Sequence, residues 1–338
     1  MRLNFEHRSA SHCETGNISN MLNYNGYQLN EPMIFGIGSG LYFFHLPFMW
    51  LDSGLPICNF RTLPGNVFVR AMKNLHIKFG LKTFVNKEKA MLEMDKLLAE
   101  GKPVGAVVGV YFLPYFSSHV LLHFNAHNIC IIGKEGDDYI VSEPVSDKLQ
   151  KLTYKELQRA RFAKGVLNSR GKMYWIIEKQ TDTSYLKKAV TAGIKRTCRN
   201  MLDILFPFVG VKGIAILSKR MRRWEEKYGE KNALRYLRQM IAALEELGTG
   251  GAGFRFLYSA FLQEASDQLN LPKLKEFSLE MNRIGDLWRQ FTIDGGRLLK
   301  NNENVTFEQL ADKLSEIAGK EKEFFLSLRK YIKTECKK

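Results

Sequence analysis

Residues 11–24 read SHCETGNISNMLNY, and this stretch decides how the rest of the chain is interpreted. Ile18, Met21 and Leu22 recur at helical spacing, so a short turn should lead into a helix with Cys13 at or just before its first residue. Free N–H groups and the macrodipole at a helix N-terminus favour a thiolate over a thiol, and the same groups can hold an oxyanion. Cys13 is therefore a candidate nucleophile. The alternative is that it is a small buried side chain, as free cysteines often are.

A second motif lies more than a hundred residues further on. Residues 127–144 read HNICIIGKEGDDYIVSEP, two apolar strands joined by a polar turn. A hairpin of this kind brings the start of its first strand beside the end of its second, so His127 and Glu143 should be cross-strand neighbours. A thiol, an imidazole and a carboxylate in these roles form a catalytic triad. Asp137 and Asp138 in the turn are weaker alternatives for the acid.

The two halves of the chain differ in their patterns. Up to about residue 180 short strands alternate with helices, whereas the remainder is almost wholly helical in pattern. We expect an α+β protein with one domain at 1–180 and a helical domain at 185–338. Strands are expected at 104–112, 127–132, 139–142 and 173–178, and helices at 87–100, 185–201, 213–228, 231–247, 276–292 and 306–333.

These motifs, together with FGIGSGLYFF at 35–44 and GTGGAGFRFLYSAFLQEA at 248–265, resemble the butirosin biosynthesis protein H family. The resemblance implies a papain-like, cysteine-protease-type N-terminal domain, similar to bacteriocin-leader peptidases, followed by a mainly α-helical domain that covers the substrate or carrier. It also implies an acyltransferase of secondary-metabolite or lipid biosynthesis. Such an enzyme moves an acyl group from a phosphopantetheine thioester on a carrier protein to an amine or hydroxyl acceptor. Cys13, His127 and Glu143 match the family's nucleophile, histidine and acidic positions.

The chain departs from the papain-like pattern at two places. Many such enzymes have a glutamine several residues before the cysteine as a second oxyanion donor, and here that position is not filled. The leader peptidases generally use an aspartate where this chain has Glu143. The candidates for oxyanion or substrate contacts around the nucleophile are His7, Ser11, His12 and Glu14, although His12 is also suited to capping the turn.

A glycine-rich loop at 248–253 precedes the helix that contains Arg255, Tyr258, Gln263 and Glu264. The loop matches no phosphate-binding motif, so nucleotide binding is not expected. Close packing of two helices at the glycines is one interpretation. The resemblance allows another, in which these four side chains line a substrate or pantetheine cleft.

The charge favours anionic partners, because 50 Lys and Arg against 35 Asp and Glu leave a net charge of +15. Twelve Lys or Arg and four Asp or Glu lie between 195 and 238, most densely around Arg220, Arg222 and Arg223. A solvated helical face would explain this run, but it also suits docking of an acidic carrier protein. No nucleic-acid-binding motif accompanies it.

Membrane, metal and redox signals are weak. The apolar run 204–217 is too short to span a bilayer, so a buried or peripheral helix is expected, with peripheral membrane contact as an option. Five dispersed cysteines without a C-x-x-C pair and an N-terminus without an apolar signal segment favour the cytoplasm. On a strand, each of His119, His123 and His127 would lie about 13 Å from the next. They could not then share a metal ion, so no metal site is expected. The only cofactor expected is acyl-phosphopantetheine, as a co-substrate.

Two other functions fit the same residues. The triad could hydrolyse a peptide or amide, as in a papain-like peptidase or amidohydrolase. A papain-like fold without turnover could instead bind an acyl chain or a carrier protein, and Cys13 would then show no enhanced reactivity.

Overall fold

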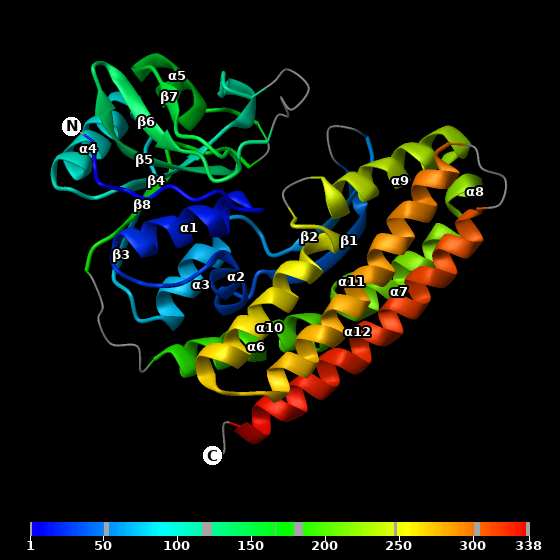
Figure 1. Ribbon diagram of the computed structural model, residues 1–338. Coiled ribbons are helices and arrows are strands. Elements are labelled where there is room, and N and C mark those ends of the chain that lie inside the picture. The colour runs from blue at the N-terminus through cyan, green and yellow to red at the C-terminus, as the bar shows by residue number, and fades with distance from the viewer. Residues whose placement is uncertain are drawn as a thin grey trace. The chain divides into compact units, whose positions relative to one another are not determined.

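The computed structural model describes residues 2–50, 54–116, 124–165, 167–178, 185–246, 249–300 and 305–335. The chain forms two compact units, one of Met1–Ile34 with Val67–Tyr185 and the other of Phe35–Asn66 with Leu186–Lys338 (Figure 1). The first contains an extended sheet and the second is mainly helical, so the predicted α+β class is confirmed. The sequence analysis expected domains at 1–180 and 185–338, whereas each of these units is made of two separate segments, and 35–66 lies in the helical unit.

The first unit is built around a six-stranded antiparallel sheet in the order β3-β8-β4-β5-β6-β7. Its elements are α1 (Cys13–Tyr24), α2 (Glu31–Ile37, which runs on into the second unit), α3 (Asn66–Asn74), β3 (Phe79–Lys82), α4 (Lys87–Ala99), β4 (Val104–Val108), the 3₁₀ turn η1 (Val110–Phe112), β5 (His127–Glu135), β6 (Asp138–Ser142), β7 (Gln150–Leu152), α5 (Tyr154–Arg161) and β8 (Met173–Ile176).

Helices cover both faces of this sheet. Consecutive side chains of a strand point to opposite faces. Tyr174 of β8 meets α1 through Asn17, whereas the sulfur of Met173 lies 3.4 Å from the guanidinium of Arg161 on α5. Helix α1 therefore packs on one face, against β4, β5 and β8, while α4 and α5 pack on the other (Figure 1).

Helix α1 is buried from Cys13 to Leu22, although many of its side chains are polar. These side chains satisfy main-chain groups of neighbouring segments, as buried polar groups must. The Asn17 amide donates to the Ile129 carbonyl at 3.1 Å, and the Asn20 amide donates to the Arg8 carbonyl at 2.8 Å. A Cβ added to Gly16 would lie 2.3 Å from that of Ala10, so the segment before Cys13 passes directly over the helix.

The second unit combines one hairpin with a set of helices. Its elements are β1 (Leu41–Trp50), β2 (Pro56–Arg61), α6 (Leu186–Leu202), α7 (Gly210–Met221), α8 (Trp224–Tyr228), α9 (Glu230–Glu245), the 3₁₀ turn η3 (Ala252–Phe254), α10 (Arg255–Leu269), α11 (Lys273–Leu298) and α12 (Phe307–Glu335).

The β1–β2 hairpin explains why 35–66 belongs with these helices. Phe43 of β1 and Phe60 of β2 are fully buried, and both rings contact Trp288 of α11 at centroid distances of 6.5 and 5.4 Å. The Nδ1 atom of His45 in β1 and the Tyr236 hydroxyl of α9 form a hydrogen bond of 2.9 Å. The apolar face of the hairpin is therefore part of the helical unit's core.

Some predicted elements have different bounds. The strand expected at 104–112 ends at Val108 and continues as η1, and the helix expected at 213–228 is divided into α7 and α8. The apolar run 204–217 is helical only from Gly210, and Leu205 and Phe206 before it are exposed. Within the described residues, no helix combines the length and the apolar character that crossing a membrane requires.

Candidate active site

Cys13 is the first residue of α1 and is buried. The preceding residue, His12, caps the helix, because its Nδ1 accepts the Thr15 N–H at 3.4 Å and pairs with the Thr15 hydroxyl at 2.9 Å. The thiol therefore lies at the N-terminus of α1, as the sequence predicted. His12 has a capping role in this geometry.

Glu31, a residue that the sequence analysis missed, fixes the same turn. One oxygen of its carboxylate accepts the His12 N–H at 2.7 Å and the Thr15 hydroxyl at 2.9 Å, and the other accepts the Ser11 N–H at 3.0 Å. Burial raises the pKa of the Glu31 carboxyl, while these three donors oppose the rise. The only local signal in the sequence is an acidic residue at the start of a helix, which does not identify Cys13 as its neighbour.

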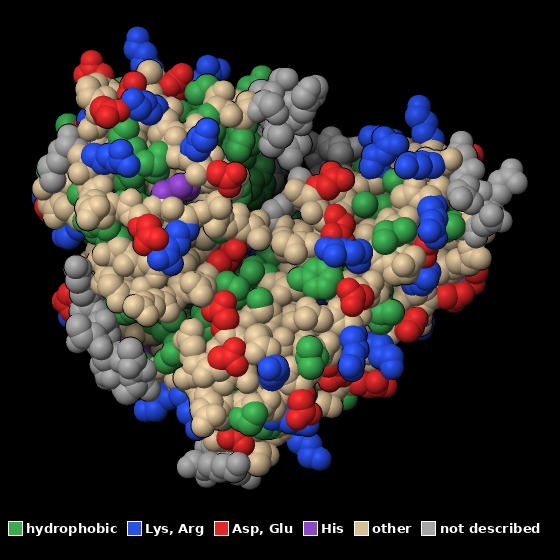
Figure 2. All heavy atoms as spheres, in the orientation of Figure 1, with side chains coloured by type: hydrophobic (Ala, Val, Ile, Leu, Met, Phe, Trp, Pro, Cys, Tyr) green, Lys and Arg blue, Asp and Glu red, His purple; other side chains and the backbone are tan. Residues whose placement is uncertain are grey.

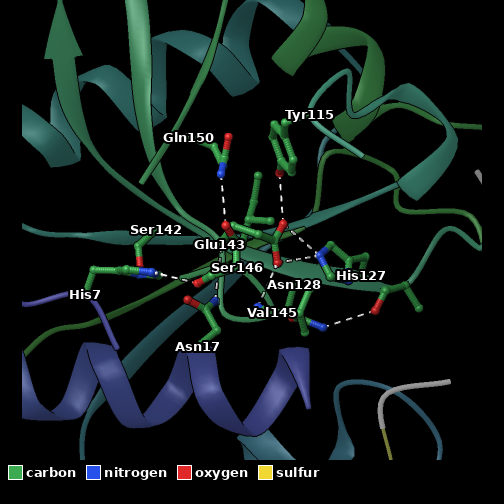
Figure 3. Close-up of polar contacts among 12 residues, drawn as sticks. His7, Asn17, Tyr115, His127, Asn128, Ser142, Glu143, Val145, Ser146 and Gln150 are labelled. Atoms are coloured by element: carbon green, nitrogen blue, oxygen red, sulfur yellow. Dashed lines mark hydrogen bonds and ion pairs between the residues drawn. The ribbon is translucent and has the colours of Figure 1, made fainter. Parts of the chain in front are cut away.

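The hairpin β5–β6 brings His127 and Glu143 together (Figure 3). His127 is the first residue of β5, and Glu143 follows the last residue of β6. The Nε2 atom of His127 lies 2.9 Å from each oxygen of the Glu143 carboxylate. In the β5–β6 ladder, Asp138 lies opposite Glu135 at the turn end of the hairpin, far from His127. Asp137 and Asp138, the alternative acids, therefore do not contact the imidazole.

Cys13 completes the group, because its side chain lies close enough to the His127 imidazole to act on its pKa. Nε2 is engaged by Glu143, which leaves Nδ1 as the ring nitrogen for the thiol. Burial by itself lowers the pKa of His127, but the charges of Glu143 and of a Cys13 thiolate, with their hydrogen bonds, raise that pKa well above its ordinary value. The imidazole is therefore held in its protonated form at neutral pH.

Two further donors hold the Glu143 carboxylate. The Tyr115 hydroxyl donates to it at 2.9 Å, and the Val145 N–H donates at 3.3 Å (Figure 3). Burial, together with the negative charge and the hydrogen bond of Glu143, raises the pKa of Tyr115, which stays a neutral donor. Sequence reasoning missed Tyr115, which lies in the loop between β4 and β5. With these contacts the fully buried carboxylate is oriented from three sides.

The other candidates near the thiol are engaged elsewhere. The ring nitrogens of His7 pair with the Ser142 hydroxyl at 2.8 Å and the Ser146 carbonyl at 2.9 Å, so His7 fastens the N-terminal segment to the end of β6 (Figure 3). The Ser11 and His12 N–H groups donate to Glu31. These contacts argue against the predicted oxyanion roles.

Glu14 also has a structural role, because its buried carboxylate accepts the Phe68 N–H in the first turn of α3 at 3.3 Å. Among the described residues, the N–H of Cys13 itself has no acceptor. The main-chain N–H of Cys13 is therefore available to donate a hydrogen bond to an oxyanion.

The predicted cleft residues of α10 are distributed differently. Arg255 is fully buried, where its guanidinium pairs with Glu321 at 2.9 Å, and Tyr258 is fully buried as well. Gln263 and Glu264 are half-buried, and Gln263 donates to Asp267 at 2.9 Å. The expected cleft lining is therefore wrong for Arg255 and Tyr258, whose side chains stabilise the helical core.

The basic residues proposed for carrier docking are in part ion-paired. Arg222 pairs with Glu308 and Asp312, and Arg223 pairs with Glu226 at 2.9 Å. Figure 2 shows Lys and Arg side chains, interspersed with acidic ones, over the part of the helical unit where α8 and α9 lie. The surface there is basic, but neighbouring carboxylates partly neutralise the charges of Arg222 and Arg223.

In the described ranges, no group of three or more His, Cys, Asp or Glu is placed to hold a metal ion. His119 and His123 lie outside the described residues. The cysteines described, Cys13, Cys58, Cys130 and Cys198, are free thiols.

Comparison with known families agrees with this geometry. Residues 155–328, just over half of the chain, match the family described as domain of unknown function DUF4872. Residues 12–144 match the N-terminal domain of butirosin biosynthesis protein H, a range that contains Cys13, His127 and Glu143. The matched range therefore contains all three side chains of the arrangement described above.

Among solved structures, a C39-like peptidase from Bacillus anthracis aligns with 54% of this chain and 100% of its own, at 15% identity and a TM-score of 0.37. A superposition this loose carries no argument about function. The curated proteins gave no match.

Proposed function

The chain belongs to the DUF4872 family and also matches the N-terminal domain of butirosin biosynthesis protein H, and from this we propose that it is a cysteine-dependent acyltransferase. The observation that supports this most is the Cys13, His127 and Glu143 arrangement, in which a thiol at a helix N-terminus pairs with an imidazole whose other nitrogen is held by a buried carboxylate. The proposed acyl donor is a phosphopantetheine thioester on a carrier protein. The proposed acceptor is an amine or hydroxyl of a small molecule or lipid.

The first half-reaction forms an acyl-enzyme. The Cys13 thiolate attacks the thioester carbonyl, and the oxygen of the tetrahedral intermediate faces the Cys13 N–H. The bond from carbon to the pantetheine sulfur then breaks, and His127 gives its proton to that sulfur, so the carrier leaves as a thiol. Glu143 orients the imidazole throughout and stabilises its charged form.

The second half-reaction returns the enzyme to its starting state. His127, now neutral, removes a proton from the acceptor amine or hydroxyl, which attacks the acyl carbon. The bond from carbon to Cys13 breaks, and the thiolate forms again beside the imidazolium. Because a thioester is already activated, positioning of the acceptor and exclusion of water supply much of the rate.

The direct test is intact-mass analysis after mixing the protein with acyl-carrier and with a small acyl thioester. Wild type and Cys58→Ser should each gain one acyl mass, whereas Cys13→Ala should gain none. Cys58 is a matched control because it is half-buried and its burial raises the pKa of its thiol. An unmodified wild type with every donor, or an adduct that persists in Cys13→Ala, would overturn covalent catalysis at Cys13.

The fate of the adduct distinguishes transfer from hydrolysis. We expect the acyl-enzyme to persist in buffer and to discharge when a panel of primary amines or alcohols is added, with the acyl group recovered on the acceptor. Discharge at the same rate with and without acceptors, releasing free acid, would instead indicate a hydrolase.

Carrier docking on the basic surface of α7 and α8 is part of the proposal. Arg220, Arg222 and Arg223 lie there, and an acidic carrier would be attracted to them. Arg223→Glu should raise the KM for acyl-carrier and leave that for a small thioester unchanged, whereas Lys275→Glu, an exposed lysine of α11, should change neither. An equal loss with both donors would place Arg223 outside carrier recognition.

A further inference from the structure

The helical unit exposes a group of large apolar side chains at one place. Phe48, Met49 and Trp50 at the end of β1 are each about half exposed, and Leu205 and Phe206, in the loop before α7, are 91% and 44% exposed. We name these five residues the apolar tip. Single exposed apolar residues are normal on a protein surface, but a contiguous set of this size marks an interaction site.

The two segments of the apolar tip are held side by side. The His45 N–H of β1 donates to the Phe208 carbonyl at 2.9 Å, and Phe44 forms a β-bridge with Val209. The ring of Phe48 lies 6.1 Å from that of Phe206. The loop thus extends the hairpin edge, and the exposed side chains form one surface on ordered backbone.

Cations flank this surface. The ring of Trp50 lies 6.4 Å from that of Tyr228, and the ammonium of Lys227 lies 5.0 Å from the same Tyr228 ring. Lys212, in the first turn of α7, is exposed. Asp203, the acidic residue that precedes the loop, is paired with Arg329 at 2.8 Å. An exposed Trp, Phe and Leu set bordered by lysines is the pattern that suits a lipid interface with anionic headgroups.

We propose that the apolar tip inserts into the headgroup region of an anionic membrane, so that the protein lies on the membrane surface. Aromatic rings with a polar edge, such as Trp50, are favoured at that depth, and burial of the apolar tip removes exposed apolar area from water. Lys212 and Lys227 supply attraction to anionic lipids, which salt screens. The proposal concerns binding alone and does not rest on the proposed acyl transfer.

The test is co-sedimentation with phosphatidylcholine vesicles prepared with or without phosphatidylglycerol. Wild type should bind the anionic vesicles, and added salt should weaken the binding. Leu205→Asp should reduce the partition coefficient by about tenfold or more, because insertion would then remove a charged carboxylate from water. Leu279→Asp, which changes a half-exposed leucine of α11, is the matched control and should bind like wild type.

Tryptophan emission gives a second measurement. Trp50 is about half exposed, Trp224 and Trp288 are buried, and Trp175 of β8 is half-buried in the other unit, so a blue shift on addition of vesicles should disappear in Trp50→Tyr and persist in Trp175→Phe. Circular dichroism and thermal unfolding check that each variant is folded. Absence of vesicle binding, or equal binding by wild type and Leu205→Asp, would overturn the proposal. So would a lipid-free dimer, seen by sedimentation velocity, that Leu205→Asp dissociates, because the apolar tip would then bind a second copy.

Discussion

Four consecutive residues at the start of α1 each have a separate role. His12 caps the helix, Cys13 faces the imidazole, Glu14 accepts a main-chain N–H of α3, and Thr15 donates to Glu31. The polar neighbours of the cysteine therefore hold the helix end in place. A backbone fixed this firmly keeps the thiol aligned with His127.

The pKa of His127 leads to a prediction for the reactivity of Cys13. Because the Glu143 charge raises that pKa, wild type should keep its imidazolium across the neutral pH range. Glu143→Gln removes the charge and lowers the pKa of His127, so the imidazolium is lost as pH rises through this lower value. Alkylation of Cys13 by iodoacetamide at about pH 7.5 should then slow by about tenfold.

Peptide mapping after alkylation assigns the modified thiol, and Cys58→Ser should react like wild type. A rate at Cys13 that Glu143→Gln leaves unchanged across this pH range would show that the imidazole does not control the thiol.

The sequence was sufficient to place Cys13, His127 and Glu143, because a helix start and a hairpin are local patterns that fix which residues meet. It was not sufficient for Glu31 and Tyr115, whose positions depend on loops and on packing between distant segments. For Arg255, the sequence instead suggested a ligand contact that the structure does not support. A polar residue in an apolar helix looks available for a ligand until its buried partner, Glu321, is known from the fold.

At the scale of elements, the sequence predicted most helices and the β5–β6 hairpin but not β1 and β2. The glycine-broken run at 35–44 carries no clear helical or strand period, and its apolar residues are buried against helices that occur more than 150 residues later. Such a partner is invisible to periodicity. Residues beyond Val108 likewise leave the strand because they form a 3₁₀ turn, which an apolar run alone does not reveal.

His45 of β1 makes the hairpin sensitive to acid. Burial, followed by the charges of Arg220 and Lys227, lowers the pKa of His45 to about 4. The unfolded chain binds a proton near pH 6.5 while the folded chain does not, so stability is lost as pH falls from about 6.5 to 4, by about 3 kcal/mol in total. In His45→Gln this loss should be absent.

Urea unfolding followed by tryptophan emission in a Trp175→Phe background measures this effect, because the other three tryptophans, Trp50, Trp224 and Trp288, all belong to the helical unit. His76→Asn, which replaces an exposed histidine of the other unit, should keep the acid sensitivity of wild type. Equal acid destabilisation in His45→Gln and wild type would refute the assignment.

At the scale of the whole molecule, the chain passes between the two units three times, after Ile34, Asn66 and Tyr185. A cut at residue 185 therefore does not separate two self-sufficient domains. It leaves the β1–β2 hairpin in the first fragment without the helices that bury Phe43 and Phe60.

Expression of residues 1–185 alone should give a protein that binds a hydrophobic dye and aggregates, because the apolar face of the hairpin is then in water. Co-expression with 186–338 should suppress both effects, and the two fragments should purify together. Gel filtration and dye fluorescence measure this, with the full chain as the reference. A monomeric 1–185 fragment that binds no dye would contradict it.

The passage of the chain between the two units also has a consequence during protein synthesis. The hairpin segment emerges from the ribosome about 120 residues before the first helix of its own unit, a delay of roughly 6–24 s at about 5–20 residues per second. All strands of the six-stranded sheet emerge within that interval, so this unit can fold first, around an insert that is still unburied. Nascent chains of this protein would thus be most open to chaperone binding and to misassembly after the first unit has formed and before translation ends.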